Sequence, residues 1–275
     1  MTAKFMQVIK NYLINKPASW MPSNTYVKYI MLISGFRLKF YSKSLSDKFS
    51  TFFIHQVTHN KQKIFFQSDV RISRFIKGFE HAGKRIWNRY KVDKLLSGIE
   101  PRTIIDVGAN IGEFSYFANK KYLGKVKIFA FDPDPITKQC FENNLVGIDA
   151  SFNLVALSNK SGEEDFYLKT DSADSSLHKP NGESIKVKTK IITLDSFFSN
   201  LELQQPVLLK MDAEGHEPEV LLGGIETLKR INWISIDAGL ERYGKSTSIE
   251  VARILTEQGF REVNISDTYL VTAKK

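Results

Sequence analysis

The chain has 275 residues, of which 42% are hydrophobic and 25% are charged, and its formal net charge is +9. These values exclude wholesale disorder, and the length suffices for one large α/β domain with an extension. A single cysteine, Cys140, excludes an internal disulfide bond and suits a reducing compartment.

The positive charge is concentrated in the N-terminal third. The first 100 residues hold 18 Lys and Arg against 5 acids, whereas the remainder holds 21 against 25. Residues 1–80 mix basic and aromatic residues without periodicity, and we treat them as an extension that precedes a domain at residues 81–275. Such a segment can bind an anionic lipid or membrane surface or an acidic glycan, or it can be an accessory lobe with a solvated basic face. Nucleic acid ranks lower, because no DNA- or RNA-binding module is recognisable.

No membrane span is expected from the sequence. The most apolar early run, residues 29–36, is eight residues long, and a span requires roughly 20. We therefore expect a cytoplasmic protein that can lie at a membrane surface. Arg71, Arg74 and Arg85 precede the core; they could reach a substrate, but solvated side chains are the favoured interpretation.

Strands and helices alternate along the rest of the chain. Helices are expected at residues 81–99, 113–122, 136–145, 218–229 and 248–258. Strands are expected at residues 103–107, 127–131, 151–157, 207–211 and 233–236, followed by a hairpin at residues 260–265 and 268–273. Two further strand-like runs, at 164–169 and 186–193, flank the polar loop 171–184, which is either a substrate lid or a surface hairpin. The pattern predicts an α/β fold with a doubly wound, mostly parallel seven-stranded sheet.

Residues 103–135 have the form of a nucleoside-binding strand–turn–helix–strand unit. Gly108 and Gly112 allow a sharp turn, and Asn110 replaces the second glycine that a dinucleotide pyrophosphate requires. Asp106 could hold an ammonium group, and Asp132, 24 residues after Gly108, could hold both hydroxyls of a ribose. Together these residues point to S-adenosylmethionine; an ordinary βα unit with a glycine turn stays the alternative.

The strand at 207–211 ends in a dense polar cluster. Asp212 is the candidate for positioning an acceptor or removing its proton, and Glu214 and His216 are further candidates for taking that proton. Glu214 could instead interact with a helix N-terminus, and His216 could be an exposed residue at a helix start. With Asp237 these residues could also bind a divalent cation such as Mg²⁺. Because acids at strand ends are common in α/β folds, no metal ligand is assigned.

Residues 71–275 resemble the FkbM family of S-adenosylmethionine-dependent methyltransferases. The resemblance rests on DVGANIGEFS at 106–115, FDPDP at 131–135, LVAL at 154–157, LKMDAEGHE at 209–217 and VLLGG at 220–224. It implies a class I methyltransferase (Rossmann-like) fold, a cofactor site that includes Ala156, and methylation of a hydroxyl on a sugar, glycan, glycolipid or related metabolite. Asp132 and Asp237 depart from the family, which often has glutamate at these positions.

Two other functions remain open at this point. One is a methyltransferase that acts on RNA or protein, although the Asn/Asp-Pro-Pro-Tyr motif typical of amino-group acceptors is absent. The other is a non-catalytic nucleoside-binding scaffold in glycan assembly, which loss of Asp106 or Asp132 would have favoured. The sequence does not predict the oligomeric state or the acceptor.

Overall fold

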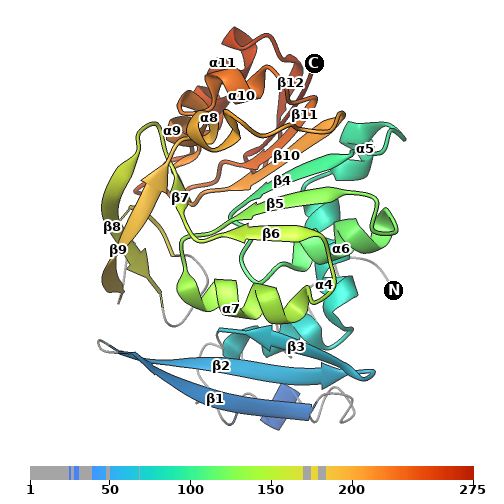
Figure 1. Ribbon diagram of the computed structural model, residues 1–275, viewed down its shortest axis with the longest axis vertical. Helices are drawn as coiled ribbons and strands as arrows, with labels where there is room; N and C mark the ends of the chain where they lie inside the picture. The colour runs from blue at the N-terminus through green and yellow to red at the C-terminus, as the bar shows by residue number, and fades with distance from the viewer. Residues whose placement is uncertain are drawn as a thin grey trace.

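The computed structural model describes residues 25, 28–30, 39–47, 50–67, 69–169, 175–178 and 184–275. Its centre is a seven-stranded sheet. In chain order the strands are β4 (Thr103–Val107), β5 (Lys127–Phe131), β6 (Ala150–Asn153), β10 (Val207–Asp212), β11 (Trp233–Asp237), β12 (Arg261–Ile265) and β13 (Leu270–Lys274). In space they follow the order β12-β13-β11-β10-β4-β5-β6, with β13 antiparallel to both of its neighbours (Figure 1). The predicted mostly parallel sheet with a terminal antiparallel hairpin is confirmed.

Helices cover both faces of this sheet. One face packs against α4 (Phe79–Arg89), α5 (Val92–Leu96) and α6 (Glu113–Lys121). The other packs against α8 (Leu194–Phe198), α9 (Glu217–Leu222), α10 (Ile225–Leu228) and α11 (Ser248–Glu257). Adjacent residues of one strand face opposite layers, as Ile104 and Ile105 do, because side chains alternate along a strand. This alternation explains why the parallel strands are apolar throughout.

Three predicted elements are wrong in detail. The helix expected at 81–99 breaks into α4 and α5 at Lys91, whose φ of 51° is left-handed. The helix expected at 218–229 breaks into α9 and α10 at Gly223, where a Cβ would lie 2.0 Å from the Ser158 carbonyl oxygen. The strand expected at 151–157 divides into β6 and β7 (Ala156–Leu157), and β7 leaves the main sheet.

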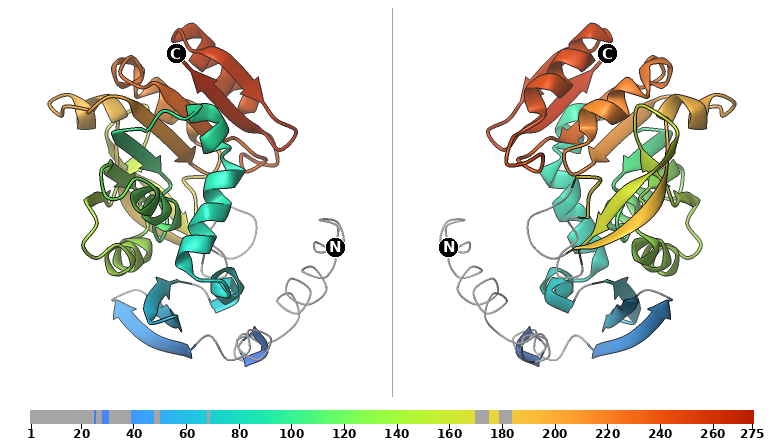
Figure 2. Two further views of the ribbon diagram at one scale, coloured as in Figure 1. Left: turned by 90° about the vertical axis from the view of Figure 1, so that its right-hand side faces the viewer. Right: turned by 90° about the vertical axis from the view of Figure 1, so that its left-hand side faces the viewer.

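The second sheet carries the excursion predicted between residues 158 and 193. Strand β7 pairs in parallel with β9 (Ile185–Ile192), and β9 pairs antiparallel with β8 (Gly162–Leu168). This sheet stands beside the C-terminal ends of the main strands (Figures 1 and 2). The connection between β8 and β9 is the predicted polar loop, of which the structure describes residues 175–178 and 184.

The third sheet belongs to the N-terminal extension. Strands β1 (Lys39–Asp47), β2 (Ser50–His59) and β3 (Gln62–Phe66) are antiparallel, and the 3-10 helix η2 (Asp69–Phe75) follows them. This sheet lies against α7 (Pro135–Asn144), and α4 runs from it along the main sheet (Figure 2). Ile64 and Phe66 share one buried cluster with Phe141 of α7.

The division predicted between residues 80 and 81 falls inside α4. Most of residues 1–38 lies outside the described residues, so a lipid- or glycan-binding surface there stays a prediction. Within the described part of the chain, no helix has the length and apolar character needed to cross a membrane.

Candidate active site

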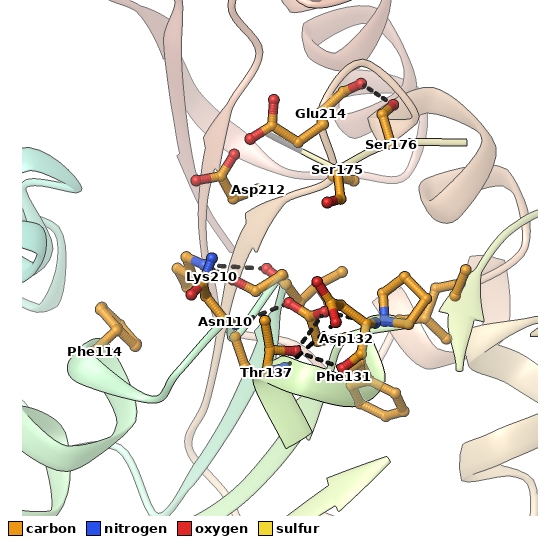
Figure 3. A pocket seen from close by; sticks show the side chains of 18 of the residues that line it. Asn110, Phe114, Phe131, Asp132, Thr137, Ser175, Ser176, Lys210, Asp212 and Glu214 are labelled. Carbon is orange, nitrogen blue, oxygen red and sulfur yellow. Dashed lines mark hydrogen bonds between the residues drawn. The ribbon is translucent and has the colours of Figure 1, made fainter. Parts of the chain in front are cut away.

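A cleft of about 1050 Å³ opens where β4, β5 and β10 end (Figure 3). Open parallel sheets place ligand sites at this edge, next to the point where the strand order reverses. Here the reversal lies between β4 and β10, which are neighbours although five strands separate them in the chain. The residues that line the cleft come from η2, α4, the turn after β4, the end of β5, β7, the described part of the loop between β8 and β9, and the end of β10.

The glycine turn forms the floor of the cleft. Gly108 has φ +68°, and a Cβ there would lie 2.0 Å from the Asp212 carbonyl oxygen, so the end of β10 packs directly on the turn. Gly112 has φ +90°, and a Cβ would lie 2.4 Å from the Leu145 side chain. Only glycine fits these two positions without moving backbone or core. The turn is therefore fixed against β10 and α7 before any ligand binds.

Asp132 lies at the end of β5 and is held by three hydrogen bonds. Its Oδ2 accepts from the backbone N–H of Asn110 at 2.9 Å, and its Oδ1 accepts from the N–H of Asp134 at 3.0 Å and from Thr137 Oγ1 at 2.9 Å. Burial raises the pKa of this carboxyl group, and the same hydrogen bonds oppose that rise. The side chain lines the cleft in a fixed orientation, as binding a ribose diol requires.

Asn110 links the turn to the N-terminal extension. It has the left-handed φ of 50°, and its Oδ1 accepts from Arg71 Nη1 at 3.0 Å and from Gln67 Nε2 at 3.3 Å. Arg71 and Arg74 both line the cleft. These two arginines therefore lie where they could reach a ligand, which is the alternative that the sequence left open.

Asp106 does not have the predicted environment. It is fully buried, does not line the cleft, and accepts from Ser115 Oγ at 2.6 Å. Its Oδ1 forms an ion pair with Lys210 Nζ at 3.1 Å. The ammonium group near Asp106 thus belongs to the protein itself, and the predicted contact with a ligand ammonium is corrected.

Lys210 is a buried cation in the lining of the cleft. Its Nζ also donates to the carbonyl oxygens of Val107, at 3.1 Å, and Gly108, at 2.8 Å. The ammonium lies 5.3 Å from the ring centroid of Tyr90 and 6.0 Å from that of Phe114. It therefore neutralises Asp106 and fixes the carbonyl groups at the start of the glycine turn.

Asp212 faces the cleft from the side opposite Asp132 (Figure 3). Its Oδ2 accepts from the hydroxyl of Tyr90 at 2.9 Å. Burial, followed by the charge of Asp212, raises the pKa of Tyr90 well above its ordinary value, so this phenol stays protonated and donates. Asp212 Oδ1 has no hydrogen-bond partner among the described residues, which leaves one carboxylate oxygen for a ligand.

The loop between β8 and β9 closes part of the cleft. Ser175, Ser176 and Leu177 line it, and Ser176 Oγ donates to the carbonyl oxygen of Glu214 at 3.0 Å. Glu214, with φ 50°, also lines the cleft. The described part of the loop therefore lies over the site, and residues 170–174 and 179–183 lie outside the described residues.

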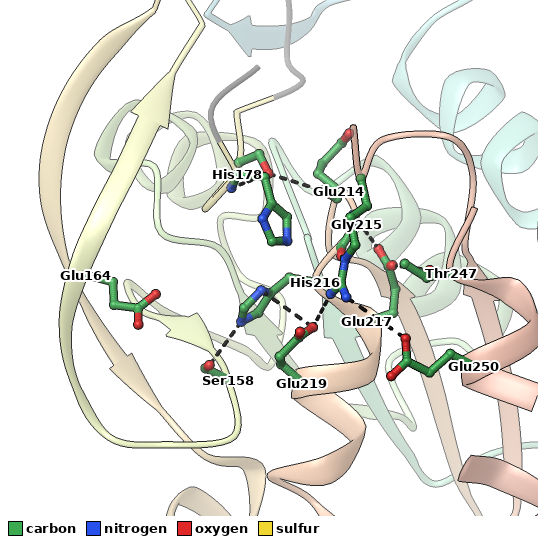
Figure 4. Close-up of polar contacts among 12 residues, drawn as sticks. Ser158, Glu164, His178, Glu214, Gly215, His216, Glu217, Glu219, Thr247 and Glu250 are labelled. Atoms are coloured by element: carbon green, nitrogen blue, oxygen red, sulfur yellow. Dashed lines mark hydrogen bonds and ion pairs between the residues drawn. The ribbon is translucent and has the colours of Figure 1, made fainter. Parts of the chain in front are cut away.

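His216 is buried, not exposed at a helix start. Its Nε2 lies 3.0 Å from Ser158 Oγ, its Nδ1 lies 3.7 Å from Glu219 Oε2, and its ring lies near that of His178, with the ring planes tilted by 54° (Figure 4). Burial lowers the pKa of His216 to about 4, against the opposing charge of Glu219. A neutral imidazole with this pKa is a weak base, so the structure favours a role in packing over proton removal.

The segment after β10 is held from behind by buried polar groups. Glu217 accepts from the N–H of Gly215 at 2.9 Å and from Thr247 Oγ1 at 2.6 Å. Arg242 donates to the carbonyl oxygen of Gly215 at 2.6 Å and pairs with Glu219. These contacts fix the backbone that carries the candidate acids into the cleft.

The divalent cation considered for the acids at the strand ends is not supported. Asp237 is paired with Arg89 of α4, and Asp212 is bonded to Tyr90. Across the described residues, no group of three or more His, Cys, Asp or Glu side chains is arranged to hold a metal ion.

The comparisons with known proteins decide the family. The model of the methyltransferase FkbM domain matches residues 106–262, which is more than half of the chain. The chain belongs to the FkbM methyltransferase family. The match spans the glycine turn, Asp132 and the segment after β10, so the resemblance inferred from the sequence motifs is confirmed.

Of two curated relatives of this FkbM family member, one is named for its acceptor and the other for the position that it methylates. The chain is 30% identical over 166 residues to hexuronic acid methyltransferase AglP of Haloferax volcanii, covering 58% of this chain and 65% of AglP. It is 25% identical over 196 residues to 2-O-methyltransferase NoeI of Sinorhizobium fredii, covering 63% of this chain and 78% of NoeI. The match thus spans just under two thirds of AglP.

Solved structures that are similar to this chain include the following two methyltransferases. The precorrin-6y C5,15-methyltransferase of Geobacter metallireducens has a TM-score of 0.41 at 14% identity, covering 68% of this chain and 89% of its own. A SAM-dependent methyltransferase from Aquifex aeolicus has a TM-score of 0.40 at 16% identity, covering 70% and 88%.

The cleft of this FkbM family member thus brings together most of the predicted residues. Those that line it are Gly108, Asn110, Asp132, Ala156, Asp212, Glu214 and His216. Sequence reasoning assigned no role to Tyr90 or Lys210, which hold the acids in place. Lys210 lies within the family-like motif at 209–217, and a lysine in an otherwise apolar buried strand was the available signal.

Proposed function

We propose that this protein is an S-adenosylmethionine-dependent O-methyltransferase whose acceptor is a hydroxyl group of a sugar, glycan or glycolipid. The observation that carries this proposal is a pair of carboxylates on facing sides of one cleft, Asp132 and Asp212 (Figure 3). The first suits a ribose diol, and the second has an oxygen available for an acceptor hydroxyl. The name of one relative, a hexuronic acid methyltransferase, supports the choice of a sugar, and that of the other, a 2-O-methyltransferase, supports methylation of an oxygen.

The residues of the cleft fit the proposed cofactor. Asp132 would hold the ribose hydroxyls, because its own three hydrogen bonds already fix both of its oxygens in place. Val155 and Ala156 offer apolar surface for the adenine ring, and Gly108 allows backbone to approach the ligand. Asp106 is withdrawn from the cleft, so the amino-acid end would be bound by other groups. When bound, S-adenosylmethionine supplies an electrophilic methyl group on a sulfonium.

The protein's own task is to orient the acceptor and to take its proton. Tyr90 donates to Asp212 Oδ2 and so directs Oδ1 toward the cleft. In this arrangement the acceptor hydroxyl would donate to Asp212 Oδ1, and that oxygen would take the proton released when the methyl group leaves the sulfonium for the acceptor oxygen. Glu214 lines the same wall and is the second candidate for this role.

Calorimetric titration with S-adenosylmethionine tests the proposal. Wild-type protein is expected to bind saturably, and Asp132→Asn, which keeps the shape of the side chain, is expected to weaken binding about tenfold or more. Asp149→Asn, at an exposed aspartate that precedes β6, is the matched control and is expected to bind like wild type. Methyl transfer is then measured with neutral and acidic sugars and with RNA. Absence of cofactor binding by the wild type would overturn the proposal.

A further inference from the structure

A groove lined with arginine side chains joins the cleft on the side of α4. It is formed by Arg74, Ala82, Arg85, Ile86, Arg89 and Glu113, and its volume is about 480 Å³. Four of these residues also line the cleft, namely Arg74, Ile86, Arg89 and Glu113. The groove and the cleft therefore adjoin each other along these four shared side chains.

The sequence spacing on α4 creates this surface. Residues 82, 85, 86 and 89 recur at intervals of three and four, so they share one face of the helix. Ala82 is small enough to leave depth at one end, and Ile86 is half-buried and offers an apolar floor. In such a groove the apolar floor can pack against the C–H groups of a sugar ring, and the guanidinium groups can bind a charged substituent of that sugar.

The positive charge of the groove is only partly neutralised within the protein. Arg74 lies 3.5 Å from Glu113, and Arg89 pairs with Asp237. Arg85 is exposed and makes no hydrogen bond or ion pair with the described residues. Two of the three guanidinium groups thus have a carboxylate partner, and Arg85 has none among the described residues. Arg85 and Arg89 lie four residues apart on the helix, where like charges repel; Asp237 offsets the charge of Arg89, whereas that of Arg85 has no such partner among the described residues.

The positive charges on α4 also act on a neighbouring histidine, His81. Burial first, and then the charges of Lys77, Arg85 and Lys84, lower the pKa of His81. The field therefore extends along the N-terminal half of α4 and opposes further positive charge. An anion at this surface would gain both from the field and from direct contact.

We propose that the groove formed by Arg74, Arg85 and Arg89 binds an oxyanion carried by the methyl acceptor. Guanidinium groups bind carboxylate and phosphate oxygens in a bidentate, planar manner that neutral sugar hydroxyls do not match. The groove is linked to the candidate acid Asp212 through adjacent residues of the chain. Arg89 lines the groove, and the next residue, Tyr90, donates a hydrogen bond to Asp212. An acceptor held by its anionic group in the groove would present a hydroxyl to the cleft.

This inference rests on the proposed function, since it assigns the oxyanion to the molecule that is methylated. Its test uses the full-length protein and three probes of similar size: D-glucuronate, D-glucose 1-phosphate and D-glucose. Their dissociation constants are measured by ligand-observed NMR titration, with and without S-adenosylhomocysteine. At least one anion is expected to bind about tenfold or more tightly than glucose. A preference for glucuronate identifies a sugar carboxylate, and a preference for glucose 1-phosphate identifies a phosphate.

Variants of α4 separate the groove from general electrostatics. Arg85→Ala is expected to weaken binding of the preferred anion about tenfold and to leave glucose unchanged, whereas Arg85→Lys retains part of the affinity. Lys84→Ala removes the same charge from an adjacent exposed position outside the groove and is expected to have little effect. If neither anion binds more tightly than glucose, or if Lys84→Ala weakens anion binding as much as Arg85→Ala does, the proposal is overturned.

The cofactor titration distinguishes this outcome from failure of the proposed function. Arg85 lines the groove but not the cleft, so Arg85→Ala is expected to bind S-adenosylmethionine like wild type. Normal cofactor binding without anion preference would refute the groove alone. Absence of cofactor binding would refute the methyltransferase proposal, whatever the anion titrations give.

Discussion

Lys210→Met is expected to lower the free energy of unfolding by about 3–5 kcal/mol, because it leaves a buried carboxylate without its partner. Methionine keeps the length and apolar body of the side chain but not the ammonium. The variant therefore loses the ion pair with Asp106 at 3.1 Å and the hydrogen bonds to the carbonyl oxygens of Val107 and Gly108. Asp106 is fully buried, and its Oδ1 has no other hydrogen-bond partner among the described residues.

The double variant Asp106→Asn/Lys210→Met measures how much of this cost comes from the unpaired charge. Removing both charges leaves neutral groups of nearly the same volume in the same place. The double variant should therefore cost less than the two single variants together, by about 1.5 kcal/mol or more. A loss of about 3–5 kcal/mol takes a large part of the roughly 5–15 kcal/mol that stabilises a typical domain. Lys210→Met is then folded but melts at a markedly lower temperature.

Urea unfolding followed by tryptophan fluorescence is a suitable assay, since Trp87 and Trp233 are both buried. Lys160→Met provides the control. It removes a lysine that is 64% exposed and pairs with Glu164 at 2.6 Å, and exposed pairs contribute about 1 kcal/mol or less. If Lys210→Met unfolds within about 1 kcal/mol of the control, or if the single costs add up in the double variant, the assigned role of the buried pair is wrong.

Three further changes test the groups around the cleft. Tyr90→Phe removes the hydrogen bond to Asp212 and is expected to lower kcat about tenfold while the Kd of the cofactor stays constant; an equal loss of both would contradict a positioning role. Gly108→Ala places a Cβ 2.0 Å from the Asp212 carbonyl oxygen at φ +68°, so we expect about 2 kcal/mol or more of destabilisation in thermal unfolding, and an unchanged Tm would refute the close packing. His216→Gln tests the buried imidazole by its pH dependence. Because the folded-state pKa of about 4 lies below the unfolded value of 6.5, wild type should lose about 2–3 kcal/mol relative to this variant between pH 7.5 and pH 4.5, and parallel pH profiles would refute it.

The features that could be predicted from the sequence are those with local signals. The strands β4 and β5 were predicted with the bounds that the structure has, because each is a short apolar run followed by a turn signal. Asp132 directly follows β5 and Asp212 ends β10, and these two strands flank β4 in the sheet. The strand order alone therefore places both acids in one cleft. The antiparallel order of the last two strands followed from the two-residue turn between them.

The rest depended on contacts between distant parts of the chain. Asp106 and Lys210 are 104 residues apart and meet because β4 and β10 pair side by side. Tyr90 reaches Asp212 across 122 residues because α4 ends over that edge of the sheet. A carboxylate before a glycine turn looks the same in sequence whether it faces a ligand or a buried lysine. The role of Asp106 was therefore mispredicted, and that of Tyr90 was not found.

The shared core of α7 and the N-terminal sheet limits how the protein can be shortened. The family match begins at Asp106, which invites a chain trimmed to that point or to residue 81. Such a fragment would lose Ile64 and Phe66 and bare the face of α7 that carries Phe141. It would also lose the Asn144 side-chain bonds to the Phe65 backbone, at 2.8 and 2.9 Å. A fusion protein that uses the sheet and helices around the cleft would thus have to include β1 to β3 as well. Without these strands, it would need redesigned apolar residues that cover α7.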